Sequence, residues 1–305
     1  MQDYLLCGWR FRSEVPLADA MRWPQDDHPV DVTARFGSVP PALAGAAFAT
    51  PFTQVDAAGN CRLEIAGVAN YLVRDGREIT IEAAPAAAMS DIRVFLLGTV
   101  LGMLCHQRGL FPLHASCVRI RARALAFCGP SGIGKSTLAA KLVERGHALL
   151  CDDVSVIDIR SPAGPLVWPA MPRLRLWQDA LGALGVDPGG MERERAQLDK
   201  YALPARAAFC SEATRLGGIF VLRWGGPRSA PRTAPLPAMW AMKALANNVY
   251  RHRPALAMGR QTQLFEAAGK IAAQLAINTL DRQRSLDDLD QVAELVERES
   301  ARWEC

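Results

Sequence analysis

The sequence predicts an α/β protein with a phosphate-loop core, a small and mainly β module before it, and helices after it. Short apolar segments separated by turn residues fill residues 4–85, as is typical of a β-rich region. A glycine-rich loop then stands between a buried-strand run and a helical pattern. Apolar residues at helical spacing occur again near the end of the sequence.

Composition and charge narrow the class of protein. The 305 residues are 50% apolar and 22% charged, which is typical of a globular protein with one large or two modest domains. The net charge of +4 is too small for the dense basic stripe of a nucleic-acid-binding protein, so we expect no nucleic-acid partner. Lysine is rare, which draws attention to the chemistry of each one. The lysines are Lys135, Lys141, Lys200, Lys243 and Lys270.

Cysteines and apolar runs favour a cytoplasmic protein with no membrane span. The eight cysteines include no C-x-x-C pair and no Cys/His cluster at zinc spacing, so we expect small buried thiols in a reducing compartment. The N-terminus carries Asp3 and only a short apolar stretch, unlike a signal peptide. The longest apolar run, 94–105, is shorter than the roughly twenty residues that a bilayer span needs.

Residues 1–88 form the predicted β-rich N-terminal module, and residues 89–305 the predicted core domain with its C-terminal helices. The β-like runs of the module are 4–11, 30–36, 61–73 and 78–83. An Ala/Pro-rich stretch at 83–89 marks the boundary. The core domain then opens with an almost wholly apolar helix from a Ser90–Asp91 cap to about Arg108, which we expect to be buried.

An α/β pattern follows. Strands are predicted at 117–120, at 124–128 and from Ala148, and a helix at 135–145 that Gly146 ends in a left-handed conformation. Loops are predicted at 161–172, 185–200 and 225–237, the second of them mobile. A last helix is predicted behind a Ser285 cap. Its apolar face comprises Leu286, Leu289, Val292, Leu295 and Val296.

The glycine-rich loop fits the phosphate-binding pattern G-x-x-x-x-G-K-S/T. Its residues are Gly129, Pro130, Ser131, Gly132, Ile133, Gly134, Lys135 and Ser136, followed by Thr137. Small residues let backbone N–H groups surround phosphate oxygens, the lysine reaches the β- and γ-phosphates, and the Ser136 hydroxyl is suited to Mg²⁺. The helix that follows points its positive end at the same anion. The loop therefore predicts a nucleotide phosphate site.

Two acidic residues are expected beside this loop. Asp152 and Asp153 follow an apolar run that returns the chain to the first strand of the core. Adjacent carboxylates suit phosphoryl transfer, in which one holds Mg²⁺ and the other accepts the proton of an attacking hydroxyl. The alternative is a solvated or capping pair of aspartates.

The block 114–153 resembles the catalytic core of the HPr kinase/phosphorylase family. The matching segments are LHASCV, GPSGIGKST and LVERGHALLCDD. The resemblance implies the compact kinase fold shared with phosphoenolpyruvate carboxykinases, and ATP and Mg²⁺ as cofactors. It implies Asp152 as the acid/base, Asp153 as a neighbouring or metal-linked charge, and Ser136 as a metal ligand. His114 would line the phosphate site. Without the resemblance, a histidine at the start of a strand is more typical of a packed or hydrogen-bonding residue.

Two segments depart from that family. Thr137 stands where the family usually has a glutamate, and MPRLRLWQDALGAL replaces the glycine-rich segment associated with the phosphorylase reaction and the hexamer. The layout and the RLRLW and DKY segments are more similar to the HPr-kinase-like enzymes of lasso-peptide biosynthesis. Those enzymes phosphorylate a serine at the C-terminal end of a ribosomally made precursor peptide.

Three further cations are candidates for contacts with phosphate or substrate. Arg173 and Arg175 alternate with leucines, so on a strand they face the same way and are suited to clamp a phosphate or carboxylate. Lys200 lies at the end of the predicted mobile loop 185–200, from which it would close over a nucleotide. The alternative for the two arginines is a solvated strand face.

We therefore expect a cytoplasmic, ATP- and Mg²⁺-dependent serine kinase of a precursor peptide, with a homo-oligomer compatible with the sequence. One alternative is a kinase of HPr or another folded protein. Another is a nucleotide-gated peptide-binding module that does not transfer phosphate. A G-protein-like switch is disfavoured because no N-K-x-D segment is present.

Overall fold

The alternating segments of the N-terminal region form one sheet. In the computed structural model, which describes residues 1–194, 198–226 and 229–303, nine strands lie in the order β3-β1-β2-β4-β9-β8-β7-β6-β5. They are β1 Gln2–Leu6, β2 Trp9–Ser13, β3 Met21–Arg22, β4 Val32–Phe36, β5 Ala46–Ala49, β6 Thr53–Asp56, β7 Cys61–Ile65, β8 Ala69–Arg74 and β9 Glu78–Ala83. Every second residue of β2 is buried, as expected of a strand with one face on a core. The predicted β-rich character of this region is confirmed.

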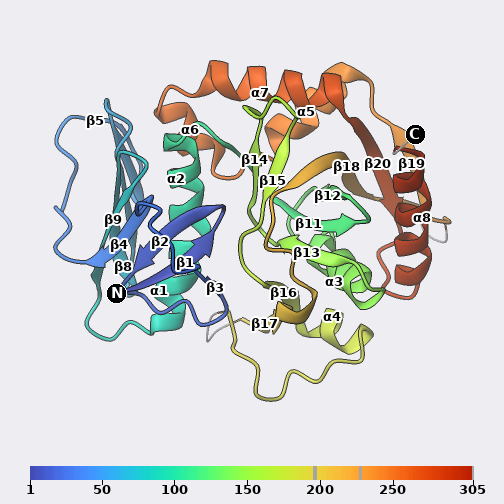
Figure 1. Ribbon diagram of the computed structural model, residues 1–305, viewed down its shortest axis with the longest axis horizontal. Coiled ribbons are helices and arrows are strands. Elements are labelled where there is room, and N and C mark those ends of the chain that lie inside the picture. Colours follow the sequence, from blue (N-terminus) through green and yellow to red (C-terminus); the bar gives the residue numbers. More distant parts are fainter. Residues whose placement is uncertain (195–197, 227–228, 304–305) are drawn as a thin grey trace.

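The apolar helical stretch lies between this sheet and the rest of the protein (Figure 1). It comprises α1 Met89–Phe95, the π-helical turn η1 Leu96–Val100 and α2 Leu101–Gln107. The predicted Ser90 cap is wrong, because the helix already begins at Met89 and the preceding Ala88 offers no capping oxygen. α2 contacts β8 on one side and, on the other, β10 Phe111–Leu113.

The same stretch corrects the expectation drawn from the shorter run 94–105. Met89–Gln107 is 19 residues long and, by length and composition alone, apolar enough to cross a bilayer. However, 67% of its apolar window is buried inside the protein. Burial on both sides by protein is what a core helix requires, so its apolar character is accounted for by packing.

A second sheet carries the core domain. Its path is β10-β14-β15-β18-β12-β11-β13, with β20 paired to β18 and β19 paired to β20. The strands are β11 Ala115–Ile120, β12 Arg123–Cys128, β13 Ala148–Cys151, β14 Ser155–Asp158, β15 Leu166–Trp168, β18 Thr214–Trp224, β19 Arg232–Pro235 and β20 Ala276–Arg282. β12, β18 and β20 run parallel to one another. Their carboxyl ends therefore meet at one edge, where ligands bind in α/β folds.

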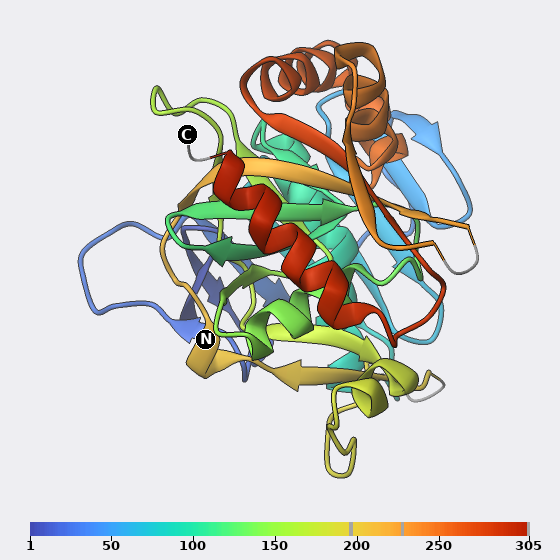
Figure 2. The ribbon, with the colours of Figure 1, turned by 90° about the vertical axis from the view of Figure 1, so that its right-hand side faces the viewer.

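Helices cover this sheet. α3 Lys135–Glu144 and α8 Leu289–Arg302 pack together on one face, and Figure 2 shows α8 lying across it. The others are α4 Gln178–Ala183, α5 Ala238–Asn247, α6 His252–Ala257 and α7 Gln261–Gln274. Gly146 ends α3 with a φ of 96°, as predicted. The predicted Ser285 cap is wrong: α8 begins after Asp288, and Leu286 lies outside it.

The predicted loops are partly ordered as strands. β15 lies within 161–172 and β19 within 225–237. A two-stranded sheet pairs β16 Arg173–Trp177 with β17 Lys200–Pro204, so Lys200 begins a strand. Residues 195–197 and 227–228 of the predicted loops lie outside the described residues.

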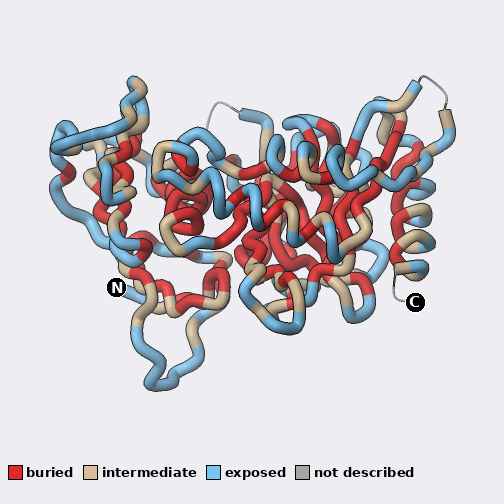
Figure 3. Tube along the Cα trace, turned by 90° about the horizontal axis from the view of Figure 1, so that it is seen from above, coloured by how far each residue is buried: buried red, intermediate tan, exposed pale blue. Residues whose placement is uncertain are grey.

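Two hydrophobic clusters hold the fold together, and the buried residues run through its middle (Figure 3). One cluster joins the N-terminal sheet to the long apolar helix and to one face of the core sheet, with Phe11, Leu101 and Leu113 among its members. The other lies beneath α3 and α8 and includes Phe127 and Val292. The seven cysteines within the described residues are buried and unpaired, as predicted.

Candidate active site

The phosphate loop joins β12 to α3 at the carboxyl edge of the core sheet. Gly129 and Gly134 adopt φ values of 141° and 95°, which favour glycine. A Cβ on Gly129 would stand 2.9 Å from the backbone oxygen of Leu222, so the loop passes too close to β18 for any side chain there. No described side chain caps the start of α3, which leaves its N–H groups available to an anion.

Lys135 is folded back onto its own loop. Its Nζ donates to the carbonyl oxygens of Gly129 at 2.9 Å and Pro130 at 3.1 Å. Burial lowers the pKa of Lys135 below its ordinary value, although the carboxylates of Asp153 and Asp152 oppose this shift. The ammonium is thus hydrogen-bonded to neutral carbonyl oxygens, at a place where a phosphate would stabilise its positive charge.

Asp152 is tied to the loop serine. Its Oδ1 accepts hydrogen bonds from the hydroxyl of Ser136 at 2.9 Å and from that of Ser116 at 2.5 Å. Its Oδ2 accepts from the backbone N–H of Arg175 at 2.7 Å. Ser116 lies on β11, and sequence reasoning missed it although it stands two residues after His114. These hydroxyl and carboxylate oxygens are hard donors of the type that Mg²⁺ prefers.

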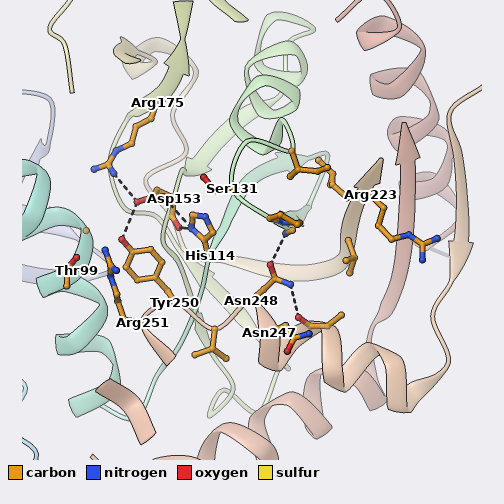
Figure 4. A pocket seen from close by; sticks show the side chains of 18 of the residues that line it. Thr99, His114, Ser131, Asp153, Arg175, Arg223, Asn247, Asn248, Tyr250 and Arg251 are labelled. Carbon is orange, nitrogen blue, oxygen red and sulfur yellow. Dashed lines mark hydrogen bonds and ion pairs between the residues drawn. The ribbon is translucent and has the colours of Figure 1, made fainter. Parts of the chain in front are cut away.

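Asp153 instead lines the cavities beside the loop, and Figure 4 shows it close to Arg175, Tyr250 and His114. Its carboxylate contacts Arg175 Nη1 at 2.9 Å, the Tyr250 hydroxyl at 3.4 Å and His114 Nδ1 at 3.4 Å. Burial acts to raise the pKa of Asp153, but the nearby Arg175 and His114 hold it below its ordinary value. Burial and Asp153 raise the pKa of Tyr250 to about 12, so the phenol keeps its proton and donates. Asp153 is therefore ionised at neutral pH.

Arg173 and Arg175, the two arginines of β16, lie in different surroundings. Arg175 joins the site, where its Nε also lies 3.2 Å from the buried Glu194. Arg173 is 4% exposed and lies 3.5 Å from Asp19 of the N-terminal region. Neither arginine therefore belongs to a solvated strand face, which was the alternative prediction. Lys200 lies 6.0 Å from the ring centre of Trp177 and lines the same cavity as Lys135.

Two cavities meet at Asp153. The smaller, of about 330 Å³, is lined by Gly134, Lys135 and Ser136. The larger, of about 900 Å³, extends to the long apolar helix and to the segment 247–251. Five residues line both cavities and form the wall between them: His114, Ser131, Asp153, Arg175 and Trp224. The arrangement can place a phosphate chain in one cavity and an acceptor in the other, with a carboxylate between them.

The segment 247–251 supports this wall, and sequence reasoning missed it. Asn248 Oδ1 accepts the N–H of Gly129 at 2.9 Å, and its backbone oxygen accepts the N–H of His114 at 2.7 Å. Asn248 thereby fixes the loop against β10. The available signal was the polar run NNVYRH directly after an apolar helix pattern.

His106 on α2 anchors the same segment, and its burial predicts that stability depends on pH. Its Nε2 lies 2.7 Å from the Tyr250 carbonyl oxygen, and burial lowers the pKa of His106 to about 4. An unfolded histidine binds a proton below about pH 6.5. Between these values the unfolded chain holds more protons, so stability is full above the upper value and declines as the pH falls.

We expect the free energy of unfolding to fall by about 3 kcal/mol from this group between pH 7 and pH 4. Chemical denaturation across this pH range should show a smaller decline in the free energy of unfolding for His106→Gln than for the wild type. His28→Gln, at an exposed histidine, is the control for the loss of an imidazole. Identical pH slopes for His106→Gln and the wild type would contradict the role of His106.

Known proteins match a short part of the chain. A 59-residue stretch is 46% identical to an HPr kinase/phosphorylase of Pelodictyon phaeoclathratiforme and covers 19% of this chain and 18% of that protein. A 55-residue stretch is 42% identical to an HPr kinase/phosphorylase of Clostridium botulinum and covers 18% and 17% of the two chains. The matched stretches thus span less than a fifth of these relatives.

A solved structure of the Hpr(Ser) kinase/phosphatase from Coxiella burnetii is also similar. It aligns with 64% of this chain and 99% of its own, at 14% identity and a TM-score of 0.35. No protein-family model matches the chain.

Proposed function

We propose that this chain, which is an HPr kinase-like protein, is an ATP- and Mg²⁺-dependent kinase of a serine at the C-terminal end of a ribosomally made precursor peptide of the lasso type. The observation that carries the kinase proposal is the carboxylate of Asp153, which stands in the wall between the phosphate-loop cavity and a second, larger one. A pure nucleotide-binding module needs the loop but has no need of a carboxylate at this place.

The larger cavity suits the end of a peptide. Its volume of about 900 Å³ and its apolar side, with Val94 and Phe95, provide room for a chain terminus with its side chains. Arg251 lines the same cavity and offers a cation to a terminal carboxylate. A serine hydroxyl bound there would approach Asp153.

In the proposed reaction the chain positions the donor and the acceptor. The loop and Lys135 hold the phosphates, and Mg²⁺, with Ser136 and Asp152 as its protein oxygens, would neutralise phosphate charge. Asp153 orients the serine hydroxyl and accepts its proton as the hydroxyl oxygen attacks the γ-phosphorus and the bond to the β-phosphate oxygen breaks. This geometry favours the reverse of the roles that the family resemblance implied for the two aspartates.

Incubation of peptides ending in serine with MgATP tests the proposal. We expect mass spectrometry to find a phosphoryl group on the terminal serine, and none on the matched peptide ending in alanine. A peptide with an amidated C-terminus tests the carboxylate contact and should react more slowly.

The names of the relatives favour a second candidate, a kinase of HPr or another folded protein. Transfer to folded HPr with none to any peptide would establish that candidate in place of ours. ATP binding with no phosphorylated product from either acceptor would instead support the binding module.

A further inference from the structure

Arg282 is a buried cation at the phosphate cavity that the proposed mechanism does not use. It is the last residue of β20, is 1% exposed and lines the cavity with Lys135 and Ser136. Burial lowers the pKa of its guanidinium. A buried charge of this kind is costly unless a partner of opposite charge meets it.

The side chain is fixed on one side only. Its Nη2 donates to the Ser285 carbonyl oxygen at 2.6 Å and its Nε to that of Gln283 at 3.3 Å. Among the described residues, its Nη1 has no hydrogen-bond partner. The nearest acidic group, Asp288, lies 3.8 Å from Nη2, beyond hydrogen-bond distance.

The free Nη1 lies against the start of α3. A Cβ built on Gly134 would stand 2.7 Å from it, so the glycine leaves the space that the guanidinium occupies. The same helix end carries N–H groups with no described side-chain cap. An orphaned buried donor and an open helix N-terminus thus point at one place, and both are suited to an anion.

We propose that Arg282 binds the β-phosphate of the nucleotide through Nη1, at the N-terminus of α3. This inference rests on the proposed nucleotide site and extends it, because it assigns a phosphate ligand that lies far from the loop in sequence. The loop backbone surrounds the inner phosphates, and Gly134 is the loop residue that Arg282 meets. The two carbonyl contacts hold the guanidinium in place before the nucleotide arrives, which reduces the entropy lost on binding.

Nucleotide affinities measured by calorimetry test this assignment without any acceptor. For Arg282→Gln we expect the affinities for MgATP and MgADP to fall about tenfold or more, because a charge-assisted hydrogen bond is lost. The affinity for AMP, which has no β-phosphate, should change less than about twofold. Arg282→Lys keeps the charge but not the fork of donors and should give an intermediate, equally selective loss.

Arg284→Gln is the matched control. Arg284 lines the same cavity and lies 5.9 Å from the same Trp224 ring that Arg282 approaches at 5.7 Å, but it is exposed. We expect it to retain most of the wild-type affinity for ATP and ADP. Thermal unfolding of each variant without nucleotide identifies any loss of folding, in which case Arg282→Lys decides the question.

An equal loss for ATP, ADP and AMP, or unchanged affinities in a folded Arg282 variant, would overturn the assignment. Failure of the wild-type protein to bind ATP would contradict the proposed function itself. A wild-type protein that transfers phosphate while Arg282→Gln keeps its ADP affinity would contradict only the role of Arg282.

Discussion

Replacing Lys135 with methionine is expected to lower the rate of phosphotransfer by about a hundredfold or more. The ammonium is held by two loop carbonyls at the start of α3, where the charge of the transferred group would develop in the proposed reaction. Loss of one preorganised charge contact costs about 3 kcal/mol of transition-state stabilisation. Methionine keeps the apolar stem, so the change reports mainly on the charge. The measurement is the initial rate of peptide phosphorylation at saturating MgATP.

Lys141→Met on the same helix is the control. Lys141 forms ion pairs with Glu144 of α3 and Asp290 of α8, and it lines neither of the two cavities. Such pairs contribute about 1 kcal/mol or less to stability, so its activity should stay within about twofold of the wild type. Wild-type activity in Lys135→Met would contradict the proposed role of the phosphate loop in phosphotransfer.

Replacing each aspartate by asparagine should separate the roles of the pair. Asp153→Asn is expected to lower kcat by about a hundredfold or more, because it removes the proposed proton acceptor. Its affinity for MgATP should change little, since Asp153 stands in the wall between the cavities and is bound by Arg175 and Tyr250.

Asp152→Asn is the matched comparison. Its side chain accepts from Ser116, Ser136 and the N–H of Arg175, and we expect its loss to raise the Mg²⁺ concentration needed for half-maximal rate. Mg²⁺ titrations at fixed ATP distinguish the two variants. A raised Mg²⁺ requirement in Asp153→Asn, with the loss of kcat in Asp152→Asn, would restore the roles implied by the family resemblance.

Much of the local structure could be predicted. The strands around the loop, helix α3 and its glycine end were each expected from short-range periodicity, and the structure confirms them. The caps at Ser90 and Ser285 were not: α1 already begins at Met89, and the Ser285 hydroxyl accepts the N–H of Asp287 in the turn before α8. Packing decides where such a helix begins.

The sequence alone was enough to predict the phosphate loop, its lysine and serine, and two acids and a histidine beside them. These residues lie within one block, so short connections between neighbouring elements were enough to bring them together. The same spacing carries the resemblance of this block to the HPr kinase/phosphorylase family.

Other features of the site depend on the tertiary structure, which brings distant residues to the loop and gives each aspartate its own set of contacts. Alternation placed Arg173 and Arg175 on one face, but only Arg175 lies close enough to reach Asp153, whereas Arg173 meets Asp19. Asn248, Tyr250 and Arg282 come from distant parts of the chain. Their positions depend on how β10, β18 and β20 pair and on how α2 packs, and no local pattern contains this information because contacts between distant segments are set by the packed core.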